Sequence, residues 1–475
     1  MKNQKVFVMG HKNPDTDSIC SAIAYADIKN RTTQTKRYIP RRAGQINEET
    51  QYVLNRFGVQ PPAYLGNIGT QVKDMDIRPK PDADRTMSLK NAWDMMQNKG
   101  IVTLPICNSE DELEGIVTIG DIADVYMDTK DSYLLSNART QYNKIRDTLD
   151  GEIVEGNGHG YFTKGKILIG TADPEVMKNY IEENDMVILG NREEDQLKAI
   201  ELNVSCIIVG MSIQVSEKVI KKAQERQIII ISSPYDTYTI ARMINQSIPV
   251  NYVMKKDNLV TFNTEDFTDD IQDVMIKHRH RAFPVINKRG KCVGTISRRN
   301  FLDMHKKQVI LVDHNEKDQA VDNIEKAEIL EIIDHHKLGS LETMKPINFR
   351  NEPVGCTATI LYRIYDEQRL EIPPKIAGLL CAAIISDTLM FRSPTCTQQD
   401  KIAASALALI ADIKIEDFAR EMFKAGSNLK DKAPEEIFYQ DYKKFIAEGN
   451  VAFGVGQISS MDEEEIGRAS CRERV

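Results

Sequence analysis

Short runs of apolar residues that lead directly into histidine and aspartate recur along this chain. The clearest is 329–333, where isoleucine and leucine dominate, and such a run predicts a parallel strand that is buried on both faces. Polar residues just past the carboxyl end of such a strand lie where open α/β sheets bind ligands. Four elements follow this pattern: 5–9 before His11, Asp15 and Asp17; 309–312 before Asp313 and His314; 329–333 before Asp334, His335 and His336; and a small-residue helix, 375–385, before Asp387.

Each of these polar residues has an ordinary explanation when it is taken alone. A single aspartate after a strand is usually a turn or cap residue, and a histidine usually lies at the surface or is satisfied in the core. Four such segments that converge on one edge are hard to explain as turns. Imidazole and carboxylate together are the ligands of borderline-hard divalent metals, so the pattern favours a metal site.

An internal repeat separates the first of these segments from the other three. Each copy has an amphipathic helix followed by short strands, and the two copies align at one offset without a gap, which indicates true repetition. Between the copies, the sequence pattern of residues 140–246 predicts a third α/β unit. No motif in that unit indicates catalysis. The matched positions are Met96 and Met275, Pro105 and Pro284, Gly115 and Gly294, and Asp124 and Asp303.

Two finer expectations concern helix ends. The pattern predicts a helix over 18–29 with Asp17 or Ser18 as its cap. It also predicts a helix over 357–365 preceded by Gly355, where free backbone N–H groups could hold a phosphate. A single glycine in that place is more often a plain turn.

Composition places the chain among globular proteins of several domains. It has 475 residues, of which 28% are charged and 41% hydrophobic, a typical balance. The net charge of −8 argues against non-specific nucleic-acid binding, which needs a basic face. No apolar run is long enough for a membrane span or a signal peptide. The eight cysteines have no paired spacing, which favours a reducing cytoplasm.

The four polar segments resemble, in type and order, the motifs of the DHH phosphoesterase superfamily, and more narrowly those of the family II inorganic pyrophosphatases. The repeat resembles a pair of CBS modules, and the unit between them resembles a DRTGG domain. The resemblance implies an α/β fold: a DHH-type parallel-sheet catalytic domain, interrupted by a CBS–DRTGG–CBS regulatory insert and followed by an incomplete small α/β lobe of DHHA2 type. The expected parts are 1–65 and 308–411 (catalytic domain), 68–127 and 250–306 (CBS modules), 140–246 (DRTGG-like domain) and 412–466 (partial lobe).

The resemblance also implies the reaction, which is hydrolysis of pyrophosphate to two orthophosphates by a hydroxide that two metal ions activate. His336 would contact the substrate and act in catalysis, and Lys424 would bind a phosphate. Histidine ligands favour Mn²⁺ or Co²⁺, and Mg²⁺ would arrive with the substrate. The metal ligands implied are, for one ion, His11 and Asp15; for the other, Asp17, His335 and Asp387; and, between the two ions, Asp313, which is also counted as catalytic.

The CBS-like modules imply adenine nucleotides as regulators, namely AMP, ADP and diadenosine polyphosphates, with inhibition by mononucleotides, and they imply a homodimer. Thr118 and Asp121 have the Thr-x-x-Asp form that such modules use on ribose and phosphate, whereas the second copy has Asn300 in place of the aspartate. Further candidate phosphate contacts, each more often a solvated charge when it stands alone, are Lys99, Arg279 and Arg298.

Two other functions stay open at this point. One is another DHH phosphoesterase that acts on oligonucleotides, cyclic dinucleotides or polyphosphate, although the Gly-Gly-Gly-His segment typical of those acting on nucleic acid is absent. The other is a catalytically silent nucleotide sensor. The stretch 467–475 has a different composition, as expected of a foreign tail, and no Ser-Arg-Lys motif follows Lys424. We therefore expect an incomplete second lobe, intact metal binding and weakened turnover.

Overall fold

The computed structural model describes residues 4–127, 131–302, 304, 306–427, 442–447 and 451–456. The chain divides into two units, Met1–Thr70 with His305–Val475, and Gln71–Met304. The first unit is discontinuous in sequence, because the second is inserted between two of its paired strands. These strands, β1 (Val6–Met9) and β17 (Gln308–Val312), are parallel neighbours.

Six parallel strands form the sheet of the first unit, in the order β19-β18-β17-β1-β2-β3. Successive residues of the central strands are buried on opposite faces, so that Val8 packs in the larger core and Met9 in a smaller one. A strand buried on both faces needs apolar residues throughout, as the sequence pattern predicted. The other strands are β2 (Tyr38–Arg42), β3 (Ala63–Tyr64), β18 (Glu328–Asp334) and β19 (Asn348–Asn351).

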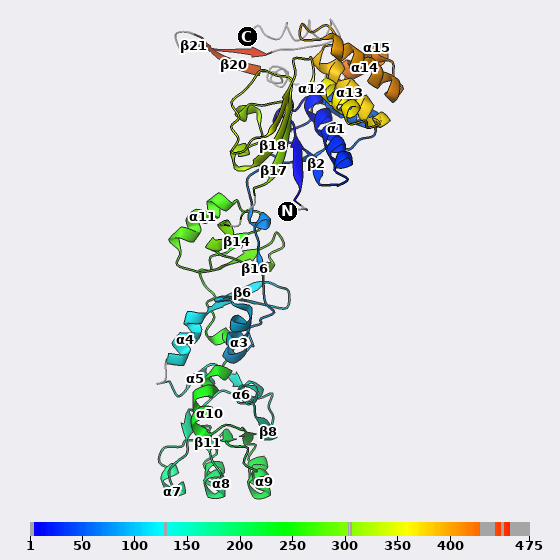
Figure 1. Cartoon of the computed structure of the whole chain (residues 1–475). Helices are drawn as coiled ribbons and strands as arrows, with labels where there is room; N and C mark the ends of the chain where they lie inside the picture. The colour runs from blue at the N-terminus through cyan, green and yellow to red at the C-terminus, as the bar shows by residue number, and fades with distance from the viewer. Residues whose placement is uncertain are drawn as a thin grey trace. The chain divides into compact units, whose positions relative to one another are not determined.

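Helices α1, α12 and α13 lie together on one side of this sheet (Figure 1) and contribute to the larger core. Small residues on α13 permit close packing. A Cβ added to Gly378 would lie 2.3 Å from the Phe57 ring, so a larger residue could not be accommodated without a shift. The helices of the unit are α1 (Thr16–Thr32), α2 (Glu48–Arg56), α12 (Thr357–Glu367), α13 (Pro374–Asp387), α14 (Gln398–Ala411) and α15 (Ile415–Gly426).

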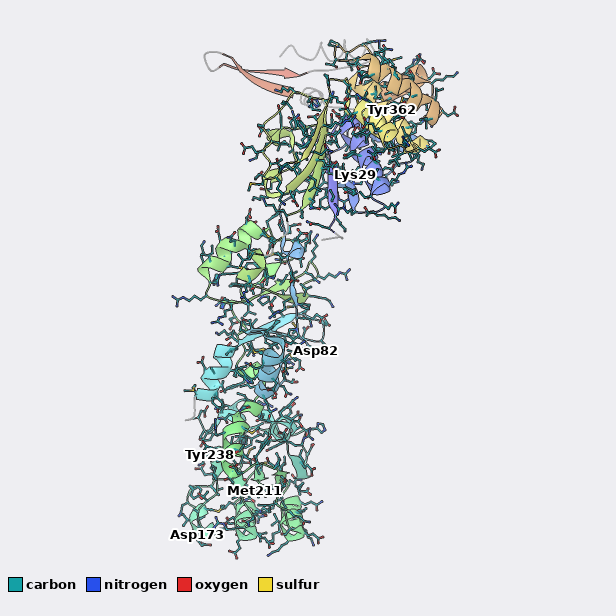
Figure 2. The ribbon with its side chains drawn as sticks, viewed as in Figure 1. Lys29, Asp82, Asp173, Met211, Tyr238 and Tyr362 are labelled. Carbon is teal, nitrogen blue, oxygen red and sulfur yellow. The ribbon has the colours of Figure 1, made fainter. Side chains whose placement is uncertain are left out.

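The start of α1 differs from the sequence expectation. Its cap is Asp15, whose Oδ1 accepts a hydrogen bond from the backbone N–H of Ser18 at 2.9 Å. Asp17 cannot cap the helix, because it lies inside the first turn and its carboxylate is bound to another helix. At the other end of α1, Lys29, labelled in Figure 2, holds the helix to β18 through an ion pair with Glu331 at 2.6 Å.

The second unit contains the predicted repeat. Met96 and Met275 are buried at equivalent places on α3 and α11, and a strand pair follows each helix. The two copies exchange an edge strand, because β4 (Arg78–Pro79), which precedes the first copy, pairs with β16 of the second. The copies comprise α3 (Leu89–Lys99), β5 (Thr103–Cys107), β6 (Leu113–Thr118) and α4 (Ile119–Met127), and then β14 (Phe262–Asn263), α11 (Thr268–Lys277), β15 (Phe283–Ile286), β16 (Cys292–Ile296) and the 3₁₀ turn η4 (Arg298–Phe301).

A five-stranded sheet follows between the two copies. Its four parallel strands are β10 (Ile167–Ile169), β11 (Met186–Leu189), β12 (Cys206–Val209) and β13 (Ile229–Ser232). Three of them, β11, β12 and β13, are largely apolar and buried, whereas β10 lies at one edge and is partly exposed, and an antiparallel strand, β8 (Glu152–Glu155), completes the other edge. The surrounding helices are α5 (Leu134–Asn137), α6 (Tyr142–Thr148), α7 (Pro174–Met177), α8 (Glu193–Glu201), α9 (Glu217–Glu225), α10 (Thr237–Met243) and the 3₁₀ turn η2 (Ile244–Ser247).

About half of the expected second lobe falls outside the described residues. Beyond α15, the structure describes a pair of antiparallel strands, β20 (Tyr442–Ala447) and β21 (Val451–Gly456). The stretch 467–475, which the sequence marks as a foreign tail, also lies outside them. Within the described ranges, no helix combines the length and the apolarity that crossing a membrane requires.

Candidate metal centre

Asp313 lies at the middle of a cluster of histidines and aspartates at the carboxyl edge of the six-stranded sheet. It follows β17 directly, is 1% exposed, and has a left-handed backbone with φ of 63°, which aspartate tolerates better than most residues. Its backbone N–H donates to the carbonyl of Ile333 at 2.9 Å, which ties the loop after β17 to β18. Its carboxylate contacts His11 and His335 from two other segments.

One group of potential ligands comprises His11, Asp15 and Asp313. Nε2 of His11 lies 3.3 Å from Oδ2 of Asp15 and 3.4 Å from Oδ2 of Asp313. Two atoms that each ligate one cation at about 2.1 Å are themselves about 3–3.5 Å apart. The three side chains are therefore spaced as ligands of a single ion would be.

A second group comprises Asp17, Asp313, His335 and Asp387, whose potential ligand atoms all lie within 4.8 Å of one another. Nε2 of His335 is 3.5 Å from Oδ1 of Asp313 and 3.8 Å from Oδ2 of Asp387. Asp313 belongs to both groups and uses a different oxygen toward each histidine. The geometry therefore offers two adjacent cation positions with one carboxylate between them.

The ring of His335 is oriented with one nitrogen free. Its Nδ1 lies 3.0 Å from the carbonyl oxygen of Val354, so that nitrogen carries a proton and donates it. Its Nε2 is buried and has no hydrogen-bond partner among the described residues. An unpartnered buried nitrogen is costly, and a cation would satisfy it. A histidine that binds a metal through one ring nitrogen commonly donates a hydrogen bond from the other ring nitrogen to a carbonyl or carboxylate, which fixes the ring.

His336 is placed differently, because it is half-exposed. Its Nδ1 is 2.9 Å from Oδ1 of Asp334 and 3.8 Å from Oδ1 of Asp313. Asp334 is fully buried and also accepts from the backbone N–H groups of His335 at 2.8 Å and of His336 at 3.2 Å. Asp334 thus fixes the turn that presents both histidines.

The helix α12 begins against this cluster, and the expectation of a phosphate at its start is wrong. The carboxylate of Asp17 accepts from the backbone N–H groups of Thr357 at 2.7 Å and of Ala358 at 3.1 Å. The N–H of Gly355 donates to Asp400 at 2.9 Å. Buried carboxylates from the protein therefore occupy the positions that a phosphate would need. Capping α12 also fixes Asp17 beside Asp313.

Negative charge is crowded into this small volume. Burial raises the pKa of Asp17 to about 7, and burial followed by the charge of Asp17 raises the pKa of Asp387 well above its ordinary value. Burial would lower the pKa of both histidines, but the neighbouring aspartates outweigh it and raise the pKa of His11 to about 11 and that of His335 to about 9. Burial opposes the charged form of Asp313 too, yet the positive charge of the two neighbouring histidines, His11 and His335, holds its pKa below the usual range. Protons or cations must balance these carboxylates.

One partly buried carboxylate near the cluster has no clear signal in the sequence. Glu49, on α2, accepts hydrogen bonds from Thr16 at 2.8 Å and from Ser386 at 2.5 Å, and burial raises its pKa. It joins the segments that carry Asp15 and Asp387. A glutamate in the first turn of a helix is ordinary in sequence, so only the fold reveals this bridge.

Lys424, predicted to bind a phosphate, is not part of the cluster. It lies in the last turn of α15 and is exposed. His314 is buried next to His11. Its Nδ1 donates to the carbonyl of Val312 at 2.9 Å, and its ring meets that of His11 edge to face. Burial lowers the pKa of His314 to about 4, so this ring is neutral.

In the second unit, a basic cleft of about 370 Å³ holds some of the predicted nucleotide contacts. Thr118 and Arg279 line it, and so does Lys255, whose Nζ forms an ion pair with Asp121 at 3.0 Å. Oγ1 of Thr118 donates to Asp121 at 2.6 Å. The threonine and the aspartate of the Thr-x-x-Asp motif are thus joined at the edge of the cleft.

The other two candidates lie elsewhere in this unit. Lys99 ends α3, is exposed, and is not among the residues that line the cleft. Arg298 donates to the backbone carbonyls of Met275 and His278 at the end of α11, so its guanidinium is engaged in holding that helix end. Sequence position alone could not distinguish these uses of a cation.

Comparison with known proteins identifies the family. The model of the DHH family, N-terminal domain, matches residues 5–384, and that of the DHHA2 domain matches residues 420–473. The DHHA2 match extends to residue 473 and so includes part of 467–475, the stretch expected to be a foreign tail. The family model therefore gives no reason to treat that part as foreign to the domain.

Two relatives match almost the whole chain. The cobalt-dependent inorganic pyrophosphatase of Clostridium perfringens is 44% identical over 97% of this chain and 83% of its own length, and the probable manganese-dependent inorganic pyrophosphatase of Thermotoga maritima is 35% identical over the same shares. A solved structure of the CBS and DRTGG domains of the Clostridium perfringens enzyme, with the activator diadenosine tetraphosphate, is 34% identical over 48% of this chain and all of that one, with a TM-score of 0.46. The chain belongs to the DHH family and, within it, to the group of cobalt- and manganese-dependent inorganic pyrophosphatases.

Proposed function

We propose that this chain hydrolyses inorganic pyrophosphate to two orthophosphates at the cluster around Asp313. The observation that carries the proposal is that Asp313 belongs both to the group of His11 and Asp15 and to the group of Asp17, His335 and Asp387. A third group, Asp313 with His335 and His336, shares the same carboxylate. A pair of cations a few ångströms apart is the arrangement used for in-line attack on phosphoryl groups. The near-complete alignment with the cobalt-dependent relative supports the same reaction.

The residues present fit two divalent ions, Mn²⁺ or Co²⁺. His11 and Asp15 would hold one, and Asp17, His335 and Asp387 the other, with Asp313 between them. The buried, unpartnered Nε2 of His335 and the raised pKa of Asp17 both support a cation at the second position. When bound, such ions neutralise phosphoryl oxygens and lower the pKa of water, and Mg²⁺ would accompany the substrate.

The protein's own side chains would orient the pyrophosphate and donate hydrogen bonds to its phosphate groups. His336 would face the pyrophosphate and hydrogen-bond the leaving phosphate, since Asp334 holds its Nδ1 and leaves Nε2 available on a half-exposed ring. Lys424 would bind the other phosphate from the second lobe, as the family motif implies. Donors that are fixed in advance stabilise developing charge without reorganisation.

We propose further that adenine nucleotides, AMP, ADP or diadenosine polyphosphates, bind the insert and change this activity. Support comes from the basic cleft, where Thr118, Lys255 and Arg279 meet. Lys99 and Arg298 have less support, because neither lines the cleft. The insert would comprise CBS modules at 68–127 and 250–306 and a DRTGG-like domain at 140–246. We propose that the chain forms a homodimer, as the CBS resemblance implies, and that it is cytoplasmic, which the seven free cysteines among the described residues support.

Product analysis tests the central part of this proposal. The full chain, stripped of metal and supplied with Mn²⁺ or Co²⁺, should release orthophosphate from pyrophosphate and leave dinucleotides and cyclic dinucleotides intact. Cleavage of the dinucleotides without release from pyrophosphate would favour a different phosphoesterase of the same superfamily. No hydrolysis together with nucleotide binding would favour a silent sensor.

A further inference from the structure

The helix α4 in the second unit is apolar, yet none of its residues is buried. Ile122 and Val125 pack only partly against the core, and the ring of Tyr126 is 44% exposed. Apolar helix faces are normally covered. The face of α4 therefore borders a space that its neighbours α3 and η2 leave open among the described residues.

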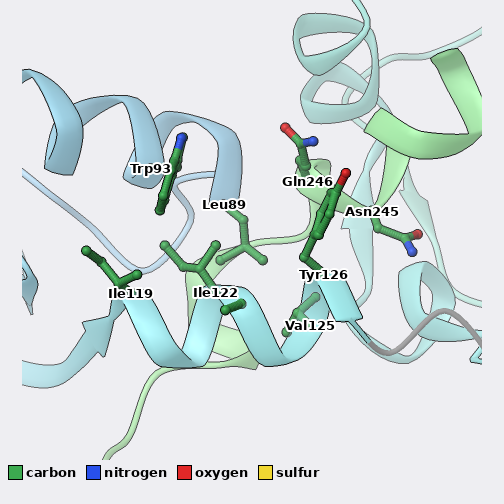
Figure 3. A pocket seen from close by; sticks show the side chains of 9 residues that line it. Leu89, Trp93, Ile119, Ile122, Val125, Tyr126, Asn245 and Gln246 are labelled. Carbon is green, nitrogen blue, oxygen red and sulfur yellow. The ribbon is translucent and has the colours of Figure 1, made fainter.

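That space is a pocket of about 360 Å³, which is within the range of small-molecule sites. Figure 3 shows Trp93, from α3, on one side and Tyr126, from α4, on the other, with Leu89 and Ile122 between them in this view. Tyr126 is fixed at the rim, because Arg242 donates to its hydroxyl oxygen at 2.7 Å. Two amide side chains, Asn245 and Gln246 from η2, complete the lining.

The chemistry of this lining selects its ligand. None of the described side chains that line the pocket is charged and none is a thiol, imidazole or carboxylate, so its lining offers no partner to a phosphate or a metal ion. The guanidinium of Arg242 at the rim is engaged with the hydroxyl of Tyr126. Two aromatic rings offer stacking faces for a flat ring. An asparagine or glutamine amide has a donor and an acceptor side by side, which match the N6 and N7 edge of adenine.

We propose that this apolar pocket binds the adenine ring of an uncharged ligand, a free base or nucleoside, separately from the basic cleft. The inference goes beyond the proposed function, because it needs neither the metal cluster nor any phosphate contact. Among the residues that the structure describes, Ile119 alone lines both hollows. A ligand in the apolar pocket would therefore lie against a residue that also lines the basic cleft.

The chain offers a direct probe of this site, since Trp93 is its single tryptophan and is 39% exposed. Titration of the full chain with adenosine should change the tryptophan emission saturably, and inorganic triphosphate should neither cause nor prevent the change. Ala123 lines the pocket on α4. Ala123→Leu would fill part of the space and should weaken adenosine binding about tenfold or more.

A matched control is Asp124→Leu, which adds a similar side chain to the same helix at a residue outside the lining, and adenosine binding should be unchanged. If Ala123→Leu does not fold, Gln246→Ala should weaken binding several-fold through loss of one amide. Unchanged emission with millimolar adenosine, equal affinity in Ala123→Leu, or displacement by triphosphate would overturn the proposal. One further result would overturn the proposal. If the chain is a dimer, Ala123→Leu converts it to a monomer and adenosine has no effect, then the face of α4 is a subunit interface instead of a ligand site. Hydrolysis of pyrophosphate without nucleotide, measured in parallel, is independent of all these outcomes.

Discussion

His336 and His335 are neighbours in sequence but differ in what surrounds them. His335 is buried and has a free Nε2 that faces Asp313 and Asp387, whereas the side chain of His336 is 49% exposed and is held by Asp334. We predict that His336→Ala keeps both metals and lowers kcat about 10²–10⁴-fold, the usual effect of losing one positioned donor. Metal content by elemental analysis and phosphate release check this together.

The control for this prediction is His159→Ala, which removes an exposed loop histidine in the other unit. It should leave kcat and metal content unchanged. If His336→Ala lost its metals in proportion to its rate, His336 would be a ligand rather than a contact of the substrate.

The raised pKa of Asp17, about 7 because of burial, makes metal binding depend on pH. The folded state holds this proton more tightly than the unfolded state, so metal-free stability contributed by Asp17 is present below about pH 4 and is lost as pH rises to about 7. A cation can take the place of the proton. The rise in Tm that Mn²⁺ causes should therefore be larger at about pH 8 than at about pH 5.5. An equal or smaller rise at the higher pH would contradict this reasoning.

At the scale of elements, Asp400 joins α14 to the start of α12, the helix that Asp17 of the cluster caps. This fully buried carboxylate accepts from the N–H of Gly355 at 2.9 Å, from the hydroxyl of Thr359 at 2.6 Å and from the N–H of Thr397 at 2.7 Å. Asp400→Ala leaves those donors without a partner, so we predict a loss of about 2–4 kcal/mol in the free energy of unfolding. Urea unfolding with Mn²⁺ present measures it, and Glu416→Ala, an exposed helix carboxylate, is the control. A loss below about 0.5 kcal/mol would show that Asp400 does not anchor these helices.

The sequence predicted the strands and their polar ends, because a buried parallel strand has a distinct apolar pattern and its carboxyl end is a fixed place in the fold. It did not predict that Asp15 caps α1, that Asp17 caps α12, or that Glu49 bridges two of the loops. The first is a local error of two or three residues in placing the helix start, because Asp15 accepts from the nearby N–H of Ser18. The other two each depend on a side chain that contacts a backbone or hydroxyl group far away in sequence, as with Asp17 and Thr357. The local pattern of apolar and polar residues carries no information about such long-range contacts.

At the scale of the molecule, the inserted unit leaves and rejoins the first unit at nearby points. Lys307 donates to the carbonyl of Gly69 at 3.0 Å, so a short linker can replace Gln71–Met304. Inserts of this kind are joined at surface positions that tolerate change. We predict that the shortened chain folds and hydrolyses pyrophosphate without any response to AMP or ADP. A response retained in the shortened chain would place the nucleotide site outside the insert.

The shared carboxylate is the central claim, and Asp313→Ala tests it most directly. The metal-stripped wild type and variant are each loaded with Mn²⁺, and bound metal and phosphate release from pyrophosphate are measured on the same samples. The account predicts two ions per chain and hydrolysis for the wild type. It predicts loss of both ions and a fall in rate of at least about 10³-fold for the variant. Retention of both ions with near-normal turnover in Asp313→Ala would contradict the account.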